Sequence, residues 1–128
     1  KGANQGDAVA QYNLGLMYSL GEGVRQDYAK AVEWYQKAAN QGDAVAQSLL
    51  GTMYDQGKGV RQDYAKAREL YLKAANQGDV AAQLSLGRLY YQGKGVRQDL
   101  TIAKEWFGKA CDSGEQFGCD IYGKMNQR

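Results

Sequence analysis

The sequence predicts an all-α fold, a right-handed α-solenoid in which antiparallel helix pairs stack with a 36-residue period. The first observation is repetition, since one pattern restarts at Gly6, Gly42 and Gly78 and is identical at most positions in its first two copies. The second is that apolar residues recur at helical spacing in two stretches of every copy. The third is composition, because 17 Gly allow close helix contacts and 10 Tyr fill the remaining space. One helix pair cannot bury its apolar face alone, so the pairs are expected to stack.

The repeats account for all 128 residues, so we predict a single solenoid over 1–128, with no linker and no second domain. Its expected segments are the tail of a preceding repeat at 1–5, full repeats at 6–41, 42–77 and 78–113, and the capping helix of a partial repeat at 114–128. The chain begins with Lys and not with Met, which is typical of a mature or trimmed fragment.

The first helix of each repeat, helix A, is predicted in repeat 1 from about Asp7 to Leu20. Asp7 suits the positive end of the helix dipole. Gly21 and Gly23 follow the last apolar residue and are expected to end the helix. The apolar face has helical spacing and consists of Ala10, Leu14, Met17 and Tyr18.

The second helix, helix B, is predicted from about Tyr28 to Asn40, with Asp27 as its N-cap. Gly42 closes it and leads into the next repeat. Its apolar face contains Tyr28, Ala31, Ala38 and either Trp34 or Tyr35.

Three glycines stand inside helix A at one register, namely Gly15, Gly51 and Gly87. A glycine inside a helix costs roughly 0.5–1 kcal/mol relative to alanine, so its recurrence needs a structural reason. We predict that helix B crosses helix A at each of these glycines, leaves no room for a Cβ atom, and places a large Tyr against the small residue.

The repeating unit AxQxxLGxMYxxGxGVxQDYxKAxxWYxKAAxQGD resembles the Sel-1-like repeat, a relative of the tetratricopeptide repeat with a longer period. The resemblance covers the whole chain and implies an α-solenoid that binds other proteins. The tetratricopeptide repeat is the alternative label, but its period is about 34 residues. Members commonly have Pro after the loop Val, where this chain has Arg25, Arg61 and Arg97.

The segment KACDSGEQFGCDIYG at 109–123 resembles the cysteine-rich subgroup of Sel-1-like proteins. In that subgroup two cysteines eight apart join helix B to the following helix A, so the resemblance implies a disulfide between Cys111 and Cys119. Such a bond would hold the terminal helix and indicates an oxidising compartment, and hence a periplasmic or secreted bacterial protein. The alternative is two free, buried thiols in a cytosolic protein.

The composition argues against catalysis. Because the chain has no His, it cannot build Ser-His-Asp or Cys-His nucleophiles or imidazole metal sites. Two Cys without further soft ligands do not form a zinc site. The glycine-rich stretches at 51–59 and 87–95 have the wrong spacing for a phosphate loop and stand at a helix end. We therefore predict no enzymatic activity, no cofactor and no metal.

Charge and hydropathy narrow the class of partner. The 16 basic and 14 acidic residues leave a net charge of +2 and are spread along the chain, so a nucleic-acid partner is not expected. No window approaches the roughly 18 apolar residues that span a bilayer, so membrane insertion is not expected either.

Candidate partner-binding residues are those of helix A that differ between repeats, since the A helices of stacked pairs line the concave face. Tyr12 and Tyr91 are favoured because tyrosine offers a large, rigid contact area, and Arg88 suits a partner carboxylate. Neutral change at exposed positions would produce the same variation, and Leu16 or Leu84 could instead pack one A helix on the next. The candidates are Tyr12, Asn13, Leu16, Leu20, Ser48, Thr52, Asp55, Gln56, Leu84, Arg88, Tyr91 and Gln92.

The predicted function is a non-enzymatic scaffold that binds another protein or an extended peptide on its concave face. The resemblance to bacterial Sel-1-like proteins implies host interaction, envelope signalling or effector neutralisation as the setting. The alternative is a structural spacer with weak end-to-end self-association.

Overall fold

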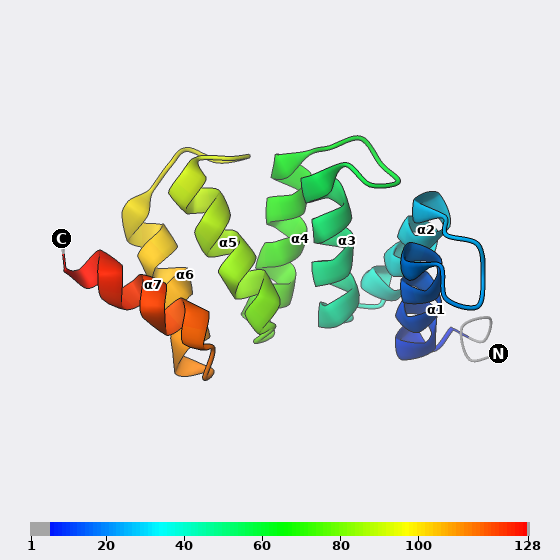
Figure 1. Cartoon of the computed structure of the whole chain (residues 1–128), viewed down its shortest axis with the longest axis horizontal. Helices are drawn as coiled ribbons and strands as arrows, with labels where there is room; N and C mark the ends of the chain where they lie inside the picture. Colours follow the sequence, from blue (N-terminus) through cyan, green and yellow to red (C-terminus); the bar gives the residue numbers. More distant parts are fainter. Residues whose placement is uncertain (1–5, 128) are drawn as a thin grey trace.

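The computed structural model describes residues 6–127, and this part of the chain is all-helical, with seven helices in one row (Figure 1). The predicted tail at 1–5 lies outside the described residues. The helices are α1 (Ala8–Leu20), α2 (Tyr28–Asn40), α3 (Ala44–Gln56), α4 (Tyr64–Asn76), α5 (Val80–Gln92), α6 (Leu100–Asp112) and α7 (Gln116–Asn126).

The helices pack in sequence order, as a solenoid requires. The pairs α1–α2, α3–α4 and α5–α6 are the A and B helices of the three repeats, and each B helix also packs on the next A helix. The fourth A helix, α7, packs on α6 at the C-terminal end of the row (Figure 1). The predicted solenoid of antiparallel helix pairs is confirmed, and its repeats are in contact mainly with their neighbours.

The helix ends follow the predicted signals. The side chain of Asp27 accepts a hydrogen bond from the Lys30 amide, which makes Asp27 the N-cap of α2. Asp7 also caps its helix, so α1 begins one residue later than predicted, at Ala8. Gly21 ends α1 with a left-handed φ of 71°, a conformation that glycine adopts at little cost.

Each mid-helix glycine faces an aromatic ring of helix B, which is the predicted Tyr in repeats 1 and 2 and a Phe in repeat 3. A Cβ atom added to Gly15 would lie 2.6 Å from Tyr35 Cε1, which also shows that Tyr35, and not Trp34, is the core residue of α2. At Gly51 the corresponding distance to the Tyr71 ring is 2.9 Å. A Cβ atom added to Gly87 would lie 2.8 Å from the ring of Phe107.

The long loop between helices A and B reaches back to the preceding repeat. In repeat 2 a Cβ atom on Gly59 would lie 2.5 Å from the carbonyl oxygen of Tyr28, the first residue of α2. The ammonium of Lys58 lies 5.3 Å from the centre of the Tyr28 ring, within cation–π range. A Cβ atom added to Gly95 would likewise lie 2.5 Å from the carbonyl carbon of Tyr64. The loops therefore connect consecutive repeats as well as consecutive helices.

Glutamine side chains join helix A to the end of helix B within a repeat. Gln41 donates to Gln11 over 2.8 Å, and Gln77 donates to Gln47 over 2.9 Å. Gln83 occupies the third equivalent position, but its partner position holds Ser113, whose hydroxyl donates to the carbonyl oxygen of Lys109. The buried Oε1 atom of Gln83 accordingly has no hydrogen-bond partner within 6–127.

Cys119 stands at the fourth position of the series Gln11, Gln47 and Gln83, and here the chain has a covalent link. Cys111 on α6 and Cys119 on α7 form a disulfide, with their Cα atoms 4.4 Å apart. The predicted disulfide is therefore confirmed. It ties the last helix to repeat 3.

Candidate functional site

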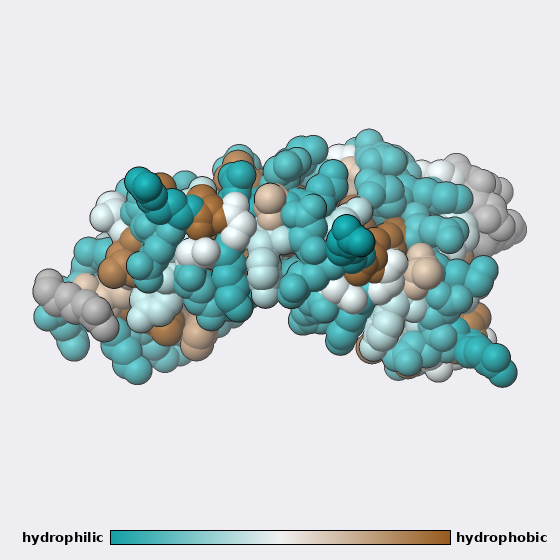
Figure 2. Space-filling model, turned by 90° about the horizontal axis from the view of Figure 1, so that it is seen from above, coloured by the Kyte–Doolittle hydropathy of each residue, from teal (hydrophilic) through white to brown (hydrophobic). Residues whose placement is uncertain are grey.

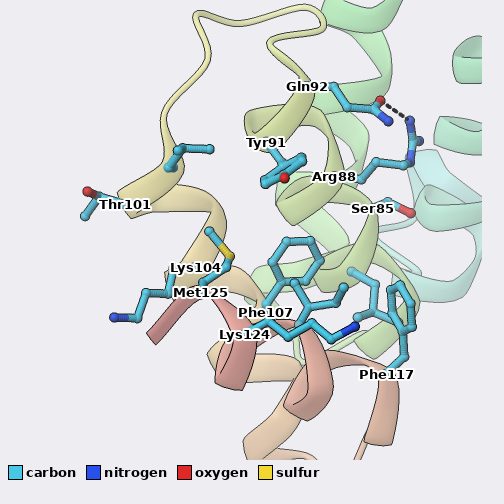
Figure 3. Close-up of a pocket in the computed structure, with 13 residues that line it drawn as sticks. Ser85, Arg88, Tyr91, Gln92, Thr101, Lys104, Phe107, Phe117, Lys124 and Met125 are labelled. Atoms are coloured by element: carbon cyan, nitrogen blue, oxygen red, sulfur yellow. Dashed lines mark hydrogen bonds between the residues drawn. The ribbon is translucent and has the colours of Figure 1, made fainter. Parts of the chain in front are cut away.

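The C-terminal half of the solenoid contains a groove between α5, α6 and α7, which we call the C-terminal groove (Figure 3). Its volume is about 770 Å³, which lies in the range of pockets that hold sizeable ligands. Its walls are helices, so the side chains that line it are held on a rigid frame. The lining residues are Leu84, Ser85, Arg88, Tyr91 and Gln92 from α5, Leu100, Thr101, Lys104 and Phe107 from α6, and Phe117, Ile121, Lys124 and Met125 from α7.

The groove is lined mainly by apolar side chains, several of which are exposed. Phe117 is 56% exposed and Tyr91 is 42% exposed, although each presents a large ring. Phe107 lies deeper and is buried. Figure 3 shows Tyr91 and Phe107 on the helices that flank α7, with Met125 and Phe117 facing them from α7. Exposed apolar side chains gathered in one groove favour contact with a partner.

The charged groups at the groove are all cationic. They are Arg88, Lys104 and Lys124, and none of the described lining residues is Asp or Glu. Arg88 forms an ion pair with Asp55 of α3, so its charge is compensated within the chain. The two lysines have no ion-pair partner in the described part of the chain. They therefore leave the groove with a positive charge.

Beneath one end of the groove lies a buried polar cluster that joins α3, α4 and α5. The Tyr71 hydroxyl donates to Asp55 Oδ2 over 2.9 Å and lies 3.2 Å from the Thr52 hydroxyl. Burial raises the pKa of Tyr71 to about 12; the Thr52 hydrogen bond opposes this rise and the negative charge of Asp55 adds to it. Asp55 therefore holds both Tyr71 and Arg88.

The predicted residues of repeat 3 come together in this groove. Leu84, Arg88, Tyr91 and Gln92 all line it. Arg88 is paired with Asp55, which differs from the expected role of a free partner for an external carboxylate, because α3 brings a buried carboxylate within its reach. Gln92 accepts a further hydrogen bond from Arg88, 3.3 Å long (Figure 3).

The predicted residues of repeat 2 lie outside the groove, and two of them are buried. Asp55 is only 7% exposed, because Arg88 and Tyr71 cover it. Ser48 is equally buried. Thr52 is half-buried, and its hydroxyl donates to the carbonyl oxygen of Ser48. These residues offer little surface to a partner, contrary to their expected place on an exposed stripe. Gln56 is exposed.

The predicted residues of repeat 1 also lie outside the groove. Tyr12 and Leu16 are half-buried and pack against the core of repeats 1 and 2, as expected if Leu16 serves packing and not binding. Asn13 and Leu20 are exposed. The structure therefore brings together only the repeat 3 members of the predicted stripe.

The sequence reasoning missed the half of the groove that α6 and α7 supply. One signal was available, because Phe117 stands at the position of Val9, Val45 and Ala81 in the other A helices. A large ring in place of a small residue marks α7 as different from the other A helices. The placement of α7 opposite α5, which makes this ring part of a groove, depends on tertiary packing.

The face seen in Figure 2 is mostly hydrophilic, with small, separate apolar patches. No group of three or more His, Cys, Asp or Glu side chains suited to a metal ion occurs between residues 6 and 127. Over the same range, every helix is too short or too polar to cross a bilayer.

Comparison with protein families identifies the repeat. The model of the Sel1 repeat matches residues 8–43, 44–79 and 80–115. These matches have the predicted 36-residue length and begin two residues after the expected boundaries. No curated protein sequence matches the chain significantly.

Solved structures resemble the fold closely. A protective antigen of uropathogenic Escherichia coli with an SLR fold is 46% identical, with a TM-score of 0.93 over 96% of this chain and 26% of that protein. A Sel1 repeat protein of Oxalobacter formigenes is 34% identical, with a TM-score of 0.89 over 93% of this chain and 49% of that one. Cysteine rich protein B of Helicobacter pylori is 32% identical, with a TM-score of 0.75 over 89% of this chain and 88% of that one. The chain thus spans about a quarter and about half of the first two.

Proposed function

Because the chain belongs to the Sel1-repeat family, whose members are generally non-catalytic scaffolds for protein–protein interaction, we propose that it binds a protein or an extended peptide in its C-terminal groove. The observation that carries the proposal is the exposure of Tyr91 and Phe117 on facing helices of one groove. A rigid helical frame supports such binding because little conformational freedom is lost on this side.

The test is site-specific photo-crosslinking in cells that produce the protein. A photoreactive phenylalanine analogue replaces Tyr91 or Phe117, and a matched control carries it at Glu69, an exposed position of α4 outside the groove. We expect the same partner to be captured from both groove positions and not from Glu69. Equal capture from all three positions would contradict the proposal.

We also propose that the protein acts outside the cytoplasm, in the periplasm or after secretion. The disulfide between Cys111 and Cys119 supports this, since disulfides persist in oxidising compartments. The similarity to a protein described as a protective antigen of a pathogen supports a role at the host interface. Envelope signalling and effector neutralisation are the alternative settings. Alkylation of intact cells without reductant tests the compartment: both cysteines should resist labelling, and labelling of both would place the protein in a reducing compartment.

A structural spacer is the second candidate, and one observation favours it. Met17 on α1 is exposed, whereas its counterparts Met53 and Leu89 are buried between helices. Leu20, three residues further along α1, is also exposed, so α1 presents two apolar side chains that could meet another copy of the chain. Sedimentation velocity across a concentration series tests stacking. A Met17→Glu/Leu20→Glu variant should lose any self-association, and a strictly monomeric wild type would rule the spacer out for this chain.

A further inference from the structure

We propose that the partner segment held in the C-terminal groove carries bulky apolar side chains flanked by Asp or Glu. This inference rests on the proposed function and adds to it the chemistry of the partner. Three properties of the groove lead to it: its apolar lining, its uncompensated positive charge and its position on rigid helices.

The apolar lining requires large apolar side chains from the partner. Exposed groove side chains such as Phe117, Tyr91 and Leu100 come from three different helices, so each stays exposed unless a partner covers it. Covering such surfaces removes apolar area from water, which is the main favourable term in association. Aliphatic residues, among them Leu84 and Ile121, complete the lining, so the groove suits Leu, Met or Phe side chains.

The charge of the groove selects the residues that flank these side chains. Lys104 and Lys124 have no carboxylate partner within the described residues, while the charge of Arg88 is already met by Asp55. The Lys104 ammonium lies 5.5 Å from the centre of the Tyr122 ring, within cation–π range. A partner that covers the groove removes water from these ammonium groups, which favours opposite charge and disfavours like charge. Figure 3 shows the Lys124 side chain among the lining side chains and the Lys104 side chain pointing away from the rings, at the edge of the groove. A carboxylate beside the apolar anchor would meet Lys124, and one further along the partner segment would meet Lys104.

Other occupants fit these observations less well. A single-stranded nucleic acid could stack on the rings, but tracking its backbone needs a continuous basic surface. Among the described residues, only two uncompensated cations line the groove. A fatty acid offers one carboxylate for two ammonium groups. A peptide supplies several carboxylates and several apolar side chains in one segment.

The test measures fluorescence anisotropy with short labelled peptides and the intact, oxidised protein. One peptide combines Leu and Phe with Glu, the second replaces Glu by Lys, and the third keeps Glu but replaces Leu and Phe by Ser. We expect the first to bind at least about tenfold more tightly than the other two, since complementary charge and apolar burial act together. Oligothymidine and laurate represent a nucleic acid and a fatty acid. We expect neither of them to displace the labelled Glu peptide from the protein.

Charge reversal locates the effect. The Lys104→Glu/Lys124→Glu variant should lose affinity for the Glu peptide and gain affinity for the Lys peptide. The gain would also show that the variant is folded. Lys66→Glu/Lys73→Glu, on α4 and outside the groove, carries the same charge change and should leave both affinities unchanged. The Phe117→Ser variant should bind the Glu peptide more weakly, and its affinity for the Lys peptide should not increase.

The outcomes separate this inference from the function on which it rests. Equal binding of the Glu and Lys peptides, no binding of any peptide, or displacement by oligothymidine or laurate would overturn the acidic, apolar partner. The scaffold function would still be judged by the crosslinks from Tyr91 and Phe117. If those crosslinks fail while the Glu peptide binds, the peptide affinity is real, but the groove is not where the cellular partner binds.

Discussion

At the residue scale, the packing between paired helices depends on a glycine that faces an aromatic ring. Gly51 receives the ring of Tyr71 so closely that an added Cβ atom would overlap it. Gly123 stands at the same register of α7, but a Cβ atom added there would meet nothing within 4 Å. The same residue type therefore has a packing role in three repeats and none in the fourth.

This difference predicts opposite effects of one substitution. Gly51→Ala should lower the free energy of unfolding by about 1–3 kcal/mol, because the ring of Tyr71 must shift in a packed core. Gly123→Ala should stabilise α7 by about 0.5–1 kcal/mol, because alanine loses less backbone entropy in a helix. Urea denaturation followed by helical circular dichroism measures both. Equal effects at the two positions would contradict the packing explanation.

Tyr71 supplies a second prediction at this scale. Burial raises its pKa from 10.0 to about 12, so the phenol stays protonated in the native protein when an unfolded chain would already lose the proton. Its contribution to stability is therefore fully present below about pH 10 and is lost as the pH rises through about 12. Absorbance titration of the phenolate should show a late step that disappears in Tyr71→Phe. Persistence of this step in the variant would assign it to another tyrosine.

At the scale of the helix pair, the glycines of the loop have unequal roles. Gly23 and Gly59 occupy the same loop position with the same φ of 75°. A Cβ atom on Gly59 would collide with the backbone of Tyr28 in the preceding repeat, whereas one on Gly23 would meet only the flexible end of Met17, 3.2 Å away. The GxG pattern thus serves contact between repeats as well as the turn itself.

Gly23 and Gly59 allow a matched experiment. Gly59→Ala should cost about 1–3 kcal/mol more than Gly23→Ala, since a backbone atom cannot move aside as a side-chain terminus can. Both variants share the cost of placing alanine at positive φ, so their difference isolates the contact with Tyr28. The urea concentrations at the midpoints of unfolding measure this difference, provided that both variants have the same m-value. Identical midpoints would mean that the loop does not support its neighbour.

At the scale of the whole molecule, contacts join neighbouring repeats, so damage at one end should stay local. The disulfide ties α7 to α6, and its removal should cost about 2–3 kcal/mol for so short a loop. Because α7 forms one wall of the groove, the same change should weaken partner binding.

The variant Cys111→Ala/Cys119→Gln tests this, since it installs the residues that repeat 2 and repeat 3 carry at these positions, Ala75 and Gln83. Hydrogen exchange should increase in α7 and hardly change in α1 to α4. Uniformly faster exchange along the chain would show that the solenoid unfolds as one unit.

The sequence predicts the frame of the molecule better than its groove. The helix ends, the buried glycines and the contact of each glycine with an aromatic ring of helix B recur in all three repeats, so a single chain contains its own comparison. Features that occur once are different. The pair of Asp55 with Arg88 joins α3 to α5, and the contribution of Phe117 depends on how α7 is placed, so neither follows from a repeating pattern.

The loops that reach back have a consequence for how the chain is made. Because residues 58–60 cover the start of α2, repeat 1 lacks part of its packing until much of repeat 2 has been synthesised. The same relation holds between Gly95 and Tyr64 one repeat later. Synthesis delivers the N-terminal end first, so each repeat is completed by its successor. Folding during translation should therefore advance in steps of one repeat and lag behind the emerging chain by the length of helix A and its loop.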